Sequence, residues 1–162
     1  MKTGFSFFRP GKLVDGELVL CLKGTHVADP VKKYSPSYEF EMRHGSSSRL
    51  MGIIRLRIGP ARQLRYPGHI GYEVKPHFRG HRYAVRSCRL LLPLALAHGL
   101  SAVWLTVDPR NVASVKTCDI LGAKCIETVR IPRAHEMYRH GARFRRRYRI
   151  DVRKALSRGK PR

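Results

Sequence analysis

Acidic residues are scarce in this sequence. Its 162 residues include 11 Asp and Glu against 33 Lys and Arg, which gives a formal net charge of +22. A field of this strength attracts polyanions and speeds their association, whether the anion is a nucleic acid, a phosphorylated cofactor or an acidic protein. Arginine that serves only to solvate the surface explains the charge equally well. The composition therefore favours an anionic partner without identifying it.

Cysteine and long apolar runs are scarce too. The four cysteines include no C-x-x-C pair and have no histidine at zinc-finger spacing, which argues against a metal site and a disulfide framework. The richest apolar run, residues 90–100, is shorter than the roughly 18 residues of a membrane helix and is broken by Pro93 and His98. Residues 1–10 lack the apolar segment and cleavage site of a signal peptide. We expect a cytoplasmic protein with reduced thiols, no metal and no membrane span.

The chain has the composition of a folded domain. Hydrophobic residues make up 43% and charged residues 27% of it, and a chain of this order suits a single hydrophobic core. The composition shifts only near the C-terminus, where residues 143–162 are crowded with arginine. We therefore expect one domain over residues 1–162, with a basic C-terminal tail from about residue 153.

Apolar and polar residues alternate in the first half of the chain, and helical spacing of apolar residues follows. Pro93 should kink the first helix. Because two strands joined through a helix run parallel with a right-handed crossover, the order of elements predicts an α/β fold. Its sheet is mixed and mostly antiparallel, with a central parallel strand pair flanked by helices. We expect strands at residues 17–22, 38–44, 50–58, 69–74, 102–107 and 124–129, helices at 83–98 and 112–121, and a last antiparallel edge strand at 144–152.

The turn between the strand at 69–74 and the helix at 83 is rich in arginine and contains Gly80. Free amides at a helix N-terminus, together with the helix dipole, bind phosphate groups. Arg79, His81 and Arg82 reinforce this turn as a phosphate site, and the two arginines add positive charge. By itself, the segment is better explained as a solvated helix start.

Four short sequence patterns favour the phosphate-binding interpretation of this turn. Gly-Tyr-x-Val-x-Pro at 71–76 is followed by Arg-Gly-x-x-x-Ala at 79–84, Asn-x-x-Ser at 111–114 and Gly-Ala at 122–123. Together they resemble the GNAT superfamily of acetyltransferases, strongly over residues 68–122, and within it a bacterial branch of predicted N-acetyltransferases. The resemblance implies the GNAT fold, acetyl-CoA as co-substrate and an amine acceptor.

The resemblance also implies where CoA binds. It places the pyrophosphate against the amides of residues 79–84, which are Arg79, Gly80, His81, Arg82, Tyr83 and Ala84, and the pantetheine arm beside Tyr72 to Val74. Asn111 matches an asparagine that either holds the pantetheine or only caps its helix. Arg82 stands where the family usually has a glycine. We expect a helical φ at Arg82, which would direct its side chain to phosphate.

Acetyl transfer needs a base for the amine and an acid for the departing thiolate. On the strand at 69–74, the candidates for the base are His69, Tyr72 and Glu73, each of which is also explained as a structural or solvated residue. Many relatives carry the acid as a tyrosine seven residues after the asparagine, and here that position is Cys118. A thiol is able to donate a proton, but a cysteine on an apolar helix face usually belongs to the core. Residues 132–141 are a second source of candidates: His135, Glu136 and Tyr138.

The sequence leaves three functions open. The first is an N-acetyltransferase in which the amine attacks the thioester directly, with an acceptor that is neutral or acidic apart from its amine, because a cationic site disfavours polycations. The second is a nucleic-acid-binding protein on the same fold, using arginines at 143–149 and 153–162. The third is a catalytically silent CoA-binding protein, suggested by Arg82 and Cys118.

Overall fold

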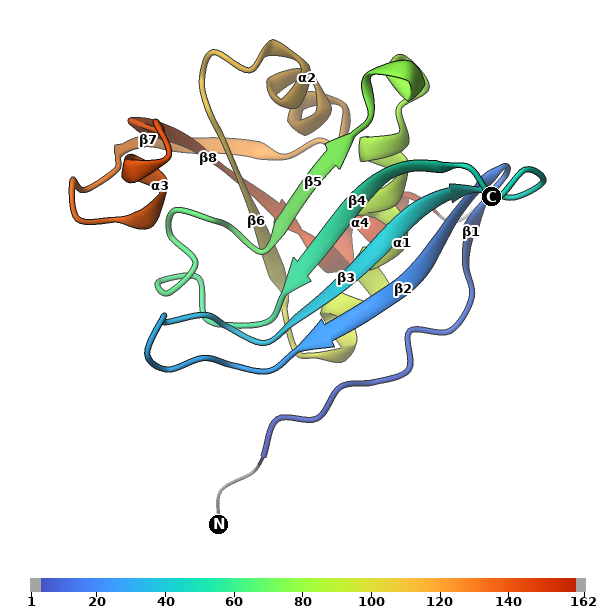
Figure 1. The fold of residues 1–162 in the computed structure, drawn as a ribbon, viewed down its shortest axis with the longest axis horizontal. Helices are drawn as coiled ribbons and strands as arrows, with labels where there is room; N and C mark the ends of the chain where they lie inside the picture. Colours follow the sequence, from blue (N-terminus) through green and yellow to red (C-terminus); the bar gives the residue numbers. More distant parts are fainter. Residues whose placement is uncertain (1–3, 160–162) are drawn as a thin grey trace.

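Two antiparallel sheets form the frame of the protein. A computed structural model describes residues 4–159 (Figure 1). The first sheet has the order β1-β2-β3-β4-β5, and the second has the order β6-β8-β7. The strands are β1 (Leu13–Asp15), β2 (Leu18–His26), β3 (Ser37–His44), β4 (Leu50–Arg57), β5 (Ile70–Val74), β6 (Ala102–Val107), β7 (Lys124–Arg130) and β8 (Phe144–Asp151).

Helices α1 (Tyr83–Ala97) and α2 (Val112–Ile120) lie where the sequence predicted helices, and three shorter helical segments were not expected. These segments are the 3-10 turn η1 (Pro76–Phe78), α3 (Glu136–Arg139) and α4 (Val152–Arg158). Helix α1 lies behind the first sheet in Figure 1, and no helix covers the face of that sheet turned to the viewer. None of the helices within residues 4–159 has the length and apolarity needed to cross a membrane. In the same part of the chain, no three metal-binding side chains cluster, and all four cysteines are free.

Alternation along the strands builds the core. Tyr38, Phe40 and Met42 of β3 are almost fully buried and join Leu91 and Ala95 of α1 in one apolar cluster, which also includes side chains of the second sheet. Burying a large apolar side chain contributes about 1.5 to 3 kcal/mol. The intervening residues of β2, β3 and β4 are mostly polar and lie on the face without a helix, as period-two alternation requires.

Two expectations about the sheets are corrected. Strand β8 is not an edge strand: it pairs with β6 on one side and β7 on the other. The central parallel pair is not observed as a ladder, because β5 and β6 belong to different sheets and all strand pairs in the described part of the chain are antiparallel. The expected basic tail starts as helix α4, whose Val152 is fully buried, and residues 160–162 lie outside the described residues.

Hydrogen bonds join the two sheets at the start of β5. The amide of His69 donates to the Trp104 carbonyl at 2.8 Å, and the Trp104 amide donates to Nδ1 of His69 at 3.0 Å. Gly68 makes this approach possible: its φ is +71°, and a Cβ there would lie 2.8 Å from the Trp104 carbonyl oxygen. From this junction β5 and β6 diverge (Figure 1), and β5 pairs only with β4 among the described strands.

Candidate active site

The diverging strands leave one edge of β5 unpaired. An extended ligand that carries amide groups is able to hydrogen-bond to such an edge as an additional strand would. The edge ends at Val74, and η1 and the N-terminus of α1 follow directly. The route for a long ligand thus runs from the sheet junction at His69 to the start of α1.

The N-terminus of α1 has no side-chain cap. Arg82 occupies the cap position, and Arg86 makes the first helical bond, from its amide to the Arg82 carbonyl. The amides of Tyr83, Ala84 and Val85 precede that bond and have no acceptor within residues 4–159. Three free amides at the positive end of a helix dipole form a site suited to a phosphate group.

The prediction of a helical φ at Arg82 is wrong. Its φ of 59° and ψ of 28° are left-handed, and Gly80 nearby has a φ of 93°. The chain reaches Arg79 in an extended conformation and has to turn sharply into α1. Two residues with positive φ make this turn, which explains why the family prefers glycine at position 82.

We predict that Arg82→Gly raises the free energy of unfolding by about 0.5 to 1 kcal/mol. A left-handed conformation costs a non-glycine residue about 1 to 2 kcal/mol, and the added freedom of glycine in the unfolded chain offsets part of the gain. Urea denaturation measures the change. The matched control is Arg79→Gly, at a φ of −72°, where glycine should only destabilise. Equal effects of both changes would contradict a strained Arg82.

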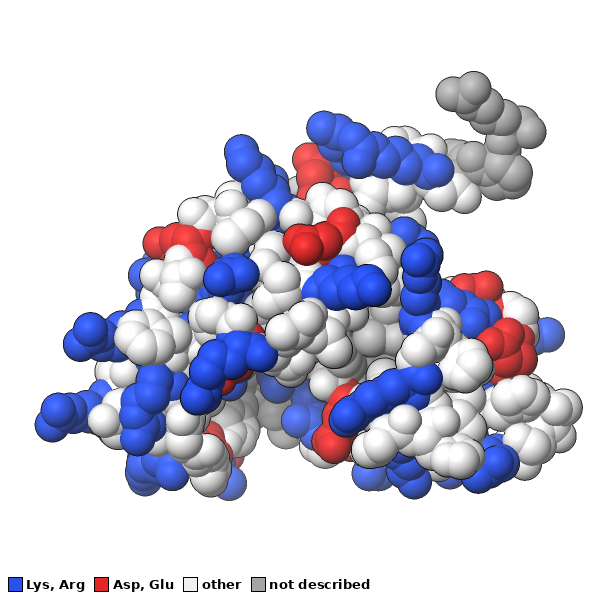
Figure 2. Space-filling view, turned by 90° about the horizontal axis from the view of Figure 1, so that it is seen from above, with Lys and Arg blue, Asp and Glu red and all other residues white. Residues whose placement is uncertain are grey.

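The arginines around this turn differ in how free they are to bind a phosphate group. Nε of Arg79 donates to the Val74 carbonyl at 3.1 Å, which fixes the side chain at the end of β5 and leaves its two terminal nitrogens unbonded in the described chain. Arg86 is engaged by Asp15 and Glu17, each at 2.8 Å. The side chains of Tyr83 and Ala84 are buried, so these residues offer their amides alone. Figure 2 shows that Lys and Arg far outnumber Asp and Glu on this side of the molecule, and that its surface is hollowed between two lobes.

Tyr72 and Cys118 lie together between β5 and the helices. The Tyr72 hydroxyl is buried and makes no hydrogen bond with any described residue, although Ser114 and Thr117 of α2 carry hydroxyls nearby. Burial raises the pKa of Tyr72 to about 12, because the loss of hydration has a larger effect than the two hydroxyls, which act to lower the pKa. Cys118 is fully buried, and burial raises the pKa of its thiol to about 12. The phenol of Tyr72 thus lies beside the position where many relatives carry a tyrosine.

The other two residues proposed for the base face away from the helices. His69 is 1% exposed; its Nδ1 accepts from Trp104 and its Nε2 donates to the Gly59 carbonyl at 2.9 Å. Burial lowers the pKa of His69, and its Nδ1 carries no proton because it accepts a hydrogen bond, so the ring is neutral. Nδ1 joins the two sheets through Trp104, and Nε2 holds the loop that follows β4. Glu73 is exposed and forms no ion pair within the described residues.

Asn111 caps α2. Its side-chain oxygen accepts from the Ser114 amide at 3.1 Å, so the capping role weighed from the sequence is confirmed. A role in holding pantetheine stays a prediction.

Residues 132–141 contact a distant part of the chain. The Tyr34 hydroxyl donates to Glu136 at 2.7 Å, and the rings of Tyr66 and His135 pack 5.0 Å apart. Nδ1 of His135 caps α3 by accepting from the Met137 amide. Beside α3 lies a hollow of about 440 Å³. Its lining includes Arg130, Arg133, Tyr138, Arg143 and Phe144.

The arginines of β8 do not form one exposed stripe. Arg147 is 6% exposed, bonds to Glu127 and lies over the Trp104 ring. Arg145 is half-buried, and burial lowers the pKa of its side chain. The expected phosphate-binding surface over 143–149 is therefore interrupted by side chains that pack inside the protein.

Comparison with known proteins agrees with this geometry. The profile of the acetyltransferase (GNAT) domain family matches residues 25–124. No curated protein gives a significant match.

Solved structures share the fold at low sequence identity. An acetyltransferase from Agrobacterium tumefaciens str. C58 is 16% identical with a TM-score of 0.60, over 91% of this chain and 98% of that one. Ribosomal-protein-S5-alanine acetyltransferase from Vibrio fischeri is 18% identical with a TM-score of 0.57, over 77% of this chain and 64% of that one. The microcin C7 self immunity acetyltransferase MccE, in complex with acetyl-CoA and AMP, is 14% identical with a TM-score of 0.55, over 71% of this chain and 61% of that one. This chain spans less than two thirds of the length of the last two.

The family profile covers more than half of the chain and includes β3 to α2, the elements that form the diverging strands and the free helix N-terminus. The chain therefore belongs to the GNAT family of acetyltransferases, which use acetyl-CoA as co-substrate.

Proposed function

We propose that this chain transfers the acetyl group of acetyl-CoA to an amine that attacks the thioester directly. The observation that carries the proposal is the continuous route from the unpaired edge of β5 to the free amides of α1. An unpaired strand edge suits the amides of pantetheine, and a helix N-terminus suits a pyrophosphate. The residues present therefore fit acetyl-CoA.

The binding residues have separate roles in this proposal. The main chain of Tyr72 and Val74 pairs with the pantetheine arm. The amides of Tyr83 and Ala84 bind the pyrophosphate, and the guanidinium of Arg79 adds a charge-assisted contact. Gly80, His81 and Arg82 shape the turn, Arg82 adds positive charge, and Asn111 orders the start of α2 across from the arm.

Tyr72 is the residue we assign to the departing sulfur. Its hydroxyl is a buried donor without an acceptor in the described residues, and a thiolate that forms between β5 and α2 would supply one. A phenol with a pKa of about 12 holds its proton against a thiolate, because an ordinary thiol has a pKa near 8.5. Tyr72 therefore stabilises the leaving group by a hydrogen bond, and Cys118 packs behind it.

Glu73 is the residue we assign to the amine. It lies one position along β5 from Tyr72, on the opposite face, where no helix restricts access. An exposed carboxylate is able to accept the proton of the amine, directly or through a water. His69 holds the sheet junction and positions the strand that carries both residues.

Thiol release from acetyl-CoA tests the proposal. Amino acids, acidic peptides and polyamines are offered as acceptors, with acetyl-CoA alone as the blank. We expect amine-dependent release with acceptors that are neutral or acidic apart from the amine, because the hollow beside α3 is lined by arginine. A clear preference for polyamines would contradict the acceptor class. Absence of release with every amine would contradict the enzyme.

A further inference from the structure

Arg57 is a half-buried cation without a counterion. It ends β4 on the face of the first sheet that no helix covers. Its Nη1 makes two long contacts of 3.4 Å, to the carbonyls of Pro67 and Gly68, and its other nitrogens make no hydrogen bond within residues 4–159. A guanidinium offers five N–H donors in a planar fork. Most of the hydrogen-bond donors of Arg57 are therefore without an acceptor in the described residues.

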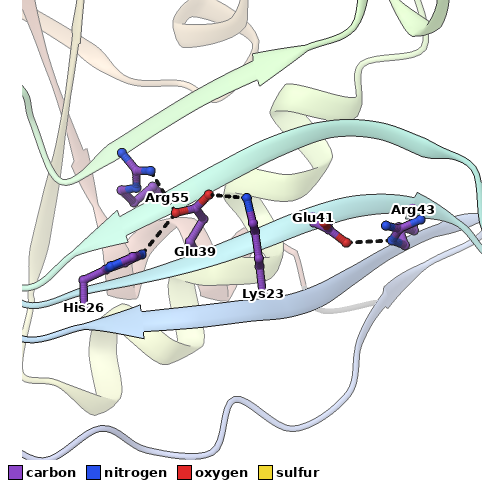
Figure 3. A network of polar contacts seen from close by, with 6 residues as sticks. All are labelled: Lys23, His26, Glu39, Glu41, Arg43 and Arg55. Atoms are coloured by element: carbon purple, nitrogen blue, oxygen red, sulfur yellow. Dashed lines mark hydrogen bonds and ion pairs between the residues drawn. The ribbon is translucent and has the colours of Figure 1, made fainter.

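The neighbouring arginine on this face, in contrast, has a counterion. Arg55 lies two residues earlier on β4 and donates to Glu39 at 2.8 Å. Figure 3 shows Glu39 on β3 between Arg55, Lys23 and His26, and these three side chains already surround its carboxylate. Arg55, with Lys23 and His26, holds the pKa of Glu39 at about 2. Because Glu39 already pairs with these side chains, it does not serve as the counterion of Arg57.

Partial burial of Arg57 without a counterion disfavours its charged form. Burial, followed by repulsion from Arg55, lowers the pKa of Arg57 from its ordinary value to about 10. The nearby phenol of Tyr34 opposes that change only weakly. A charged group that is partly removed from water without a counterion is unfavourable, and an anionic ligand would relieve the cost.

Arg57 lies beside the part of β5 to which the proposed function assigns the reaction. A Cβ added to Gly71 would lie 3.3 Å from Nη1 of Arg57, so the guanidinium rests directly against β5, one residue from Tyr72. The carbonyls that it touches belong to the turn leading into the sheet junction at His69. Glu73 follows on the same face of β5. The guanidinium and the residue assigned to the amine therefore flank the same stretch of strand.

We infer that the acceptor carries a carboxylate next to its amine, and that Arg57 binds this carboxylate. The inference rests on the proposed function and names the acceptor class: an amino acid or a chain end with a free acidic group, in contrast to a polyamine. A bidentate pair between guanidinium and carboxylate would use the planar fork and orient the amine toward β5.

Matched pairs of acceptors test the inference. Each amine is offered once with a free carboxylate and once as the carboxamide, and kcat/KM for thiol release is measured for both. For the wild type we expect a preference for the carboxylate on the order of tenfold or more, the size of one charge-assisted hydrogen bond.

Three variants identify the residue responsible. Arg57→Gln should reduce the preference to about twofold or less, and Arg57→Lys should retain an intermediate preference, because lysine keeps the charge but not the fork. Arg62→Gln removes the same charge from an exposed position and should leave the preference unchanged. Circular dichroism melting confirms that the variants are folded.

The outcomes separate the two claims. Turnover without a preference for the carboxylate, or a preference that survives in Arg57→Gln, would overturn the assignment of Arg57 and leave the acetyltransferase intact. An equal loss in Arg57→Gln and Arg62→Gln would overturn it too, because the general field would then be responsible. No turnover with any acceptor would overturn the proposed function and the inference together.

Discussion

Replacing Gly68 with alanine is expected to lower the free energy of unfolding by about 3 kcal/mol and to abolish measurable binding of acetyl-CoA. The φ of +71° is strained for alanine, and the new methyl group would lie 2.8 Å from the Trp104 carbonyl oxygen and 3.2 Å from the Thr106 amide. Because those atoms are main chain of β6, they cannot move without opening the junction between the sheets. Chemical denaturation and calorimetry measure the two effects.

Gly99→Ala is the matched control for Gly68→Ala. Gly99 has a similar φ of +80°, but nothing lies within 4 Å of an added Cβ. This variant should lose only about 1 kcal/mol and should keep its affinity for acetyl-CoA. If both variants lost the same stability and bound the ligand equally, the close approach of β5 and β6 would not be needed to build the site.

Tyr72→Phe is expected to lower kcat for thiol release by about 10- to 100-fold without destabilising the protein. The hydroxyl forms no hydrogen bond in the described structure, so its removal takes away a buried polar group that lacks a partner. Such a change is neutral or slightly stabilising. The loss of a hydrogen bond to a charged leaving group costs about 1.5 to 3 kcal/mol, which accounts for the expected fall in rate.

A fall in kcat without a loss of stability distinguishes a catalytic role of Tyr72 from a packing role. A purely structural Tyr72 would show the reverse pattern, with lower stability and an unchanged kcat. Cys118→Ala serves as a comparison. Because its thiol is part of the apolar core, this change should create a cavity and lower stability by about 1 kcal/mol or more. It should leave kcat unchanged, because Tyr72 is still present.

The elements of the fold were predictable from local patterns, but the pairing of the strands was not. Period-two alternation located β3, β4 and β5 to within a residue or so, because half-buried strands alternate regularly. The place of β8 depends on which strands it joins across the sheet, and its own sequence does not contain that information. The same holds for the divergence of β5 and β6, which depends on the contact of Gly68 with Trp104.

The candidate site was predictable in part. The free amides at the start of α1 follow from a glycine turn before a helix, whereas the left-handed φ of Arg82 contradicts the usual preference of arginine. Burial of Cys118 was suggested by its apolar neighbours. Alternation along β4 would have placed Arg57 on the same face as Arg55, but its missing counterion appears only when Glu39 is seen to be shared by other cations.

Calorimetric titration with acetyl-CoA tests the central claim most directly. If the edge of β5 and the N-terminus of α1 form the site, one molecule of acetyl-CoA should bind per chain with micromolar affinity. Because the ligand binds only the folded state, the melting temperature should also rise with its concentration. No binding heat, together with a melting temperature unmoved by millimolar acetyl-CoA, would contradict the account.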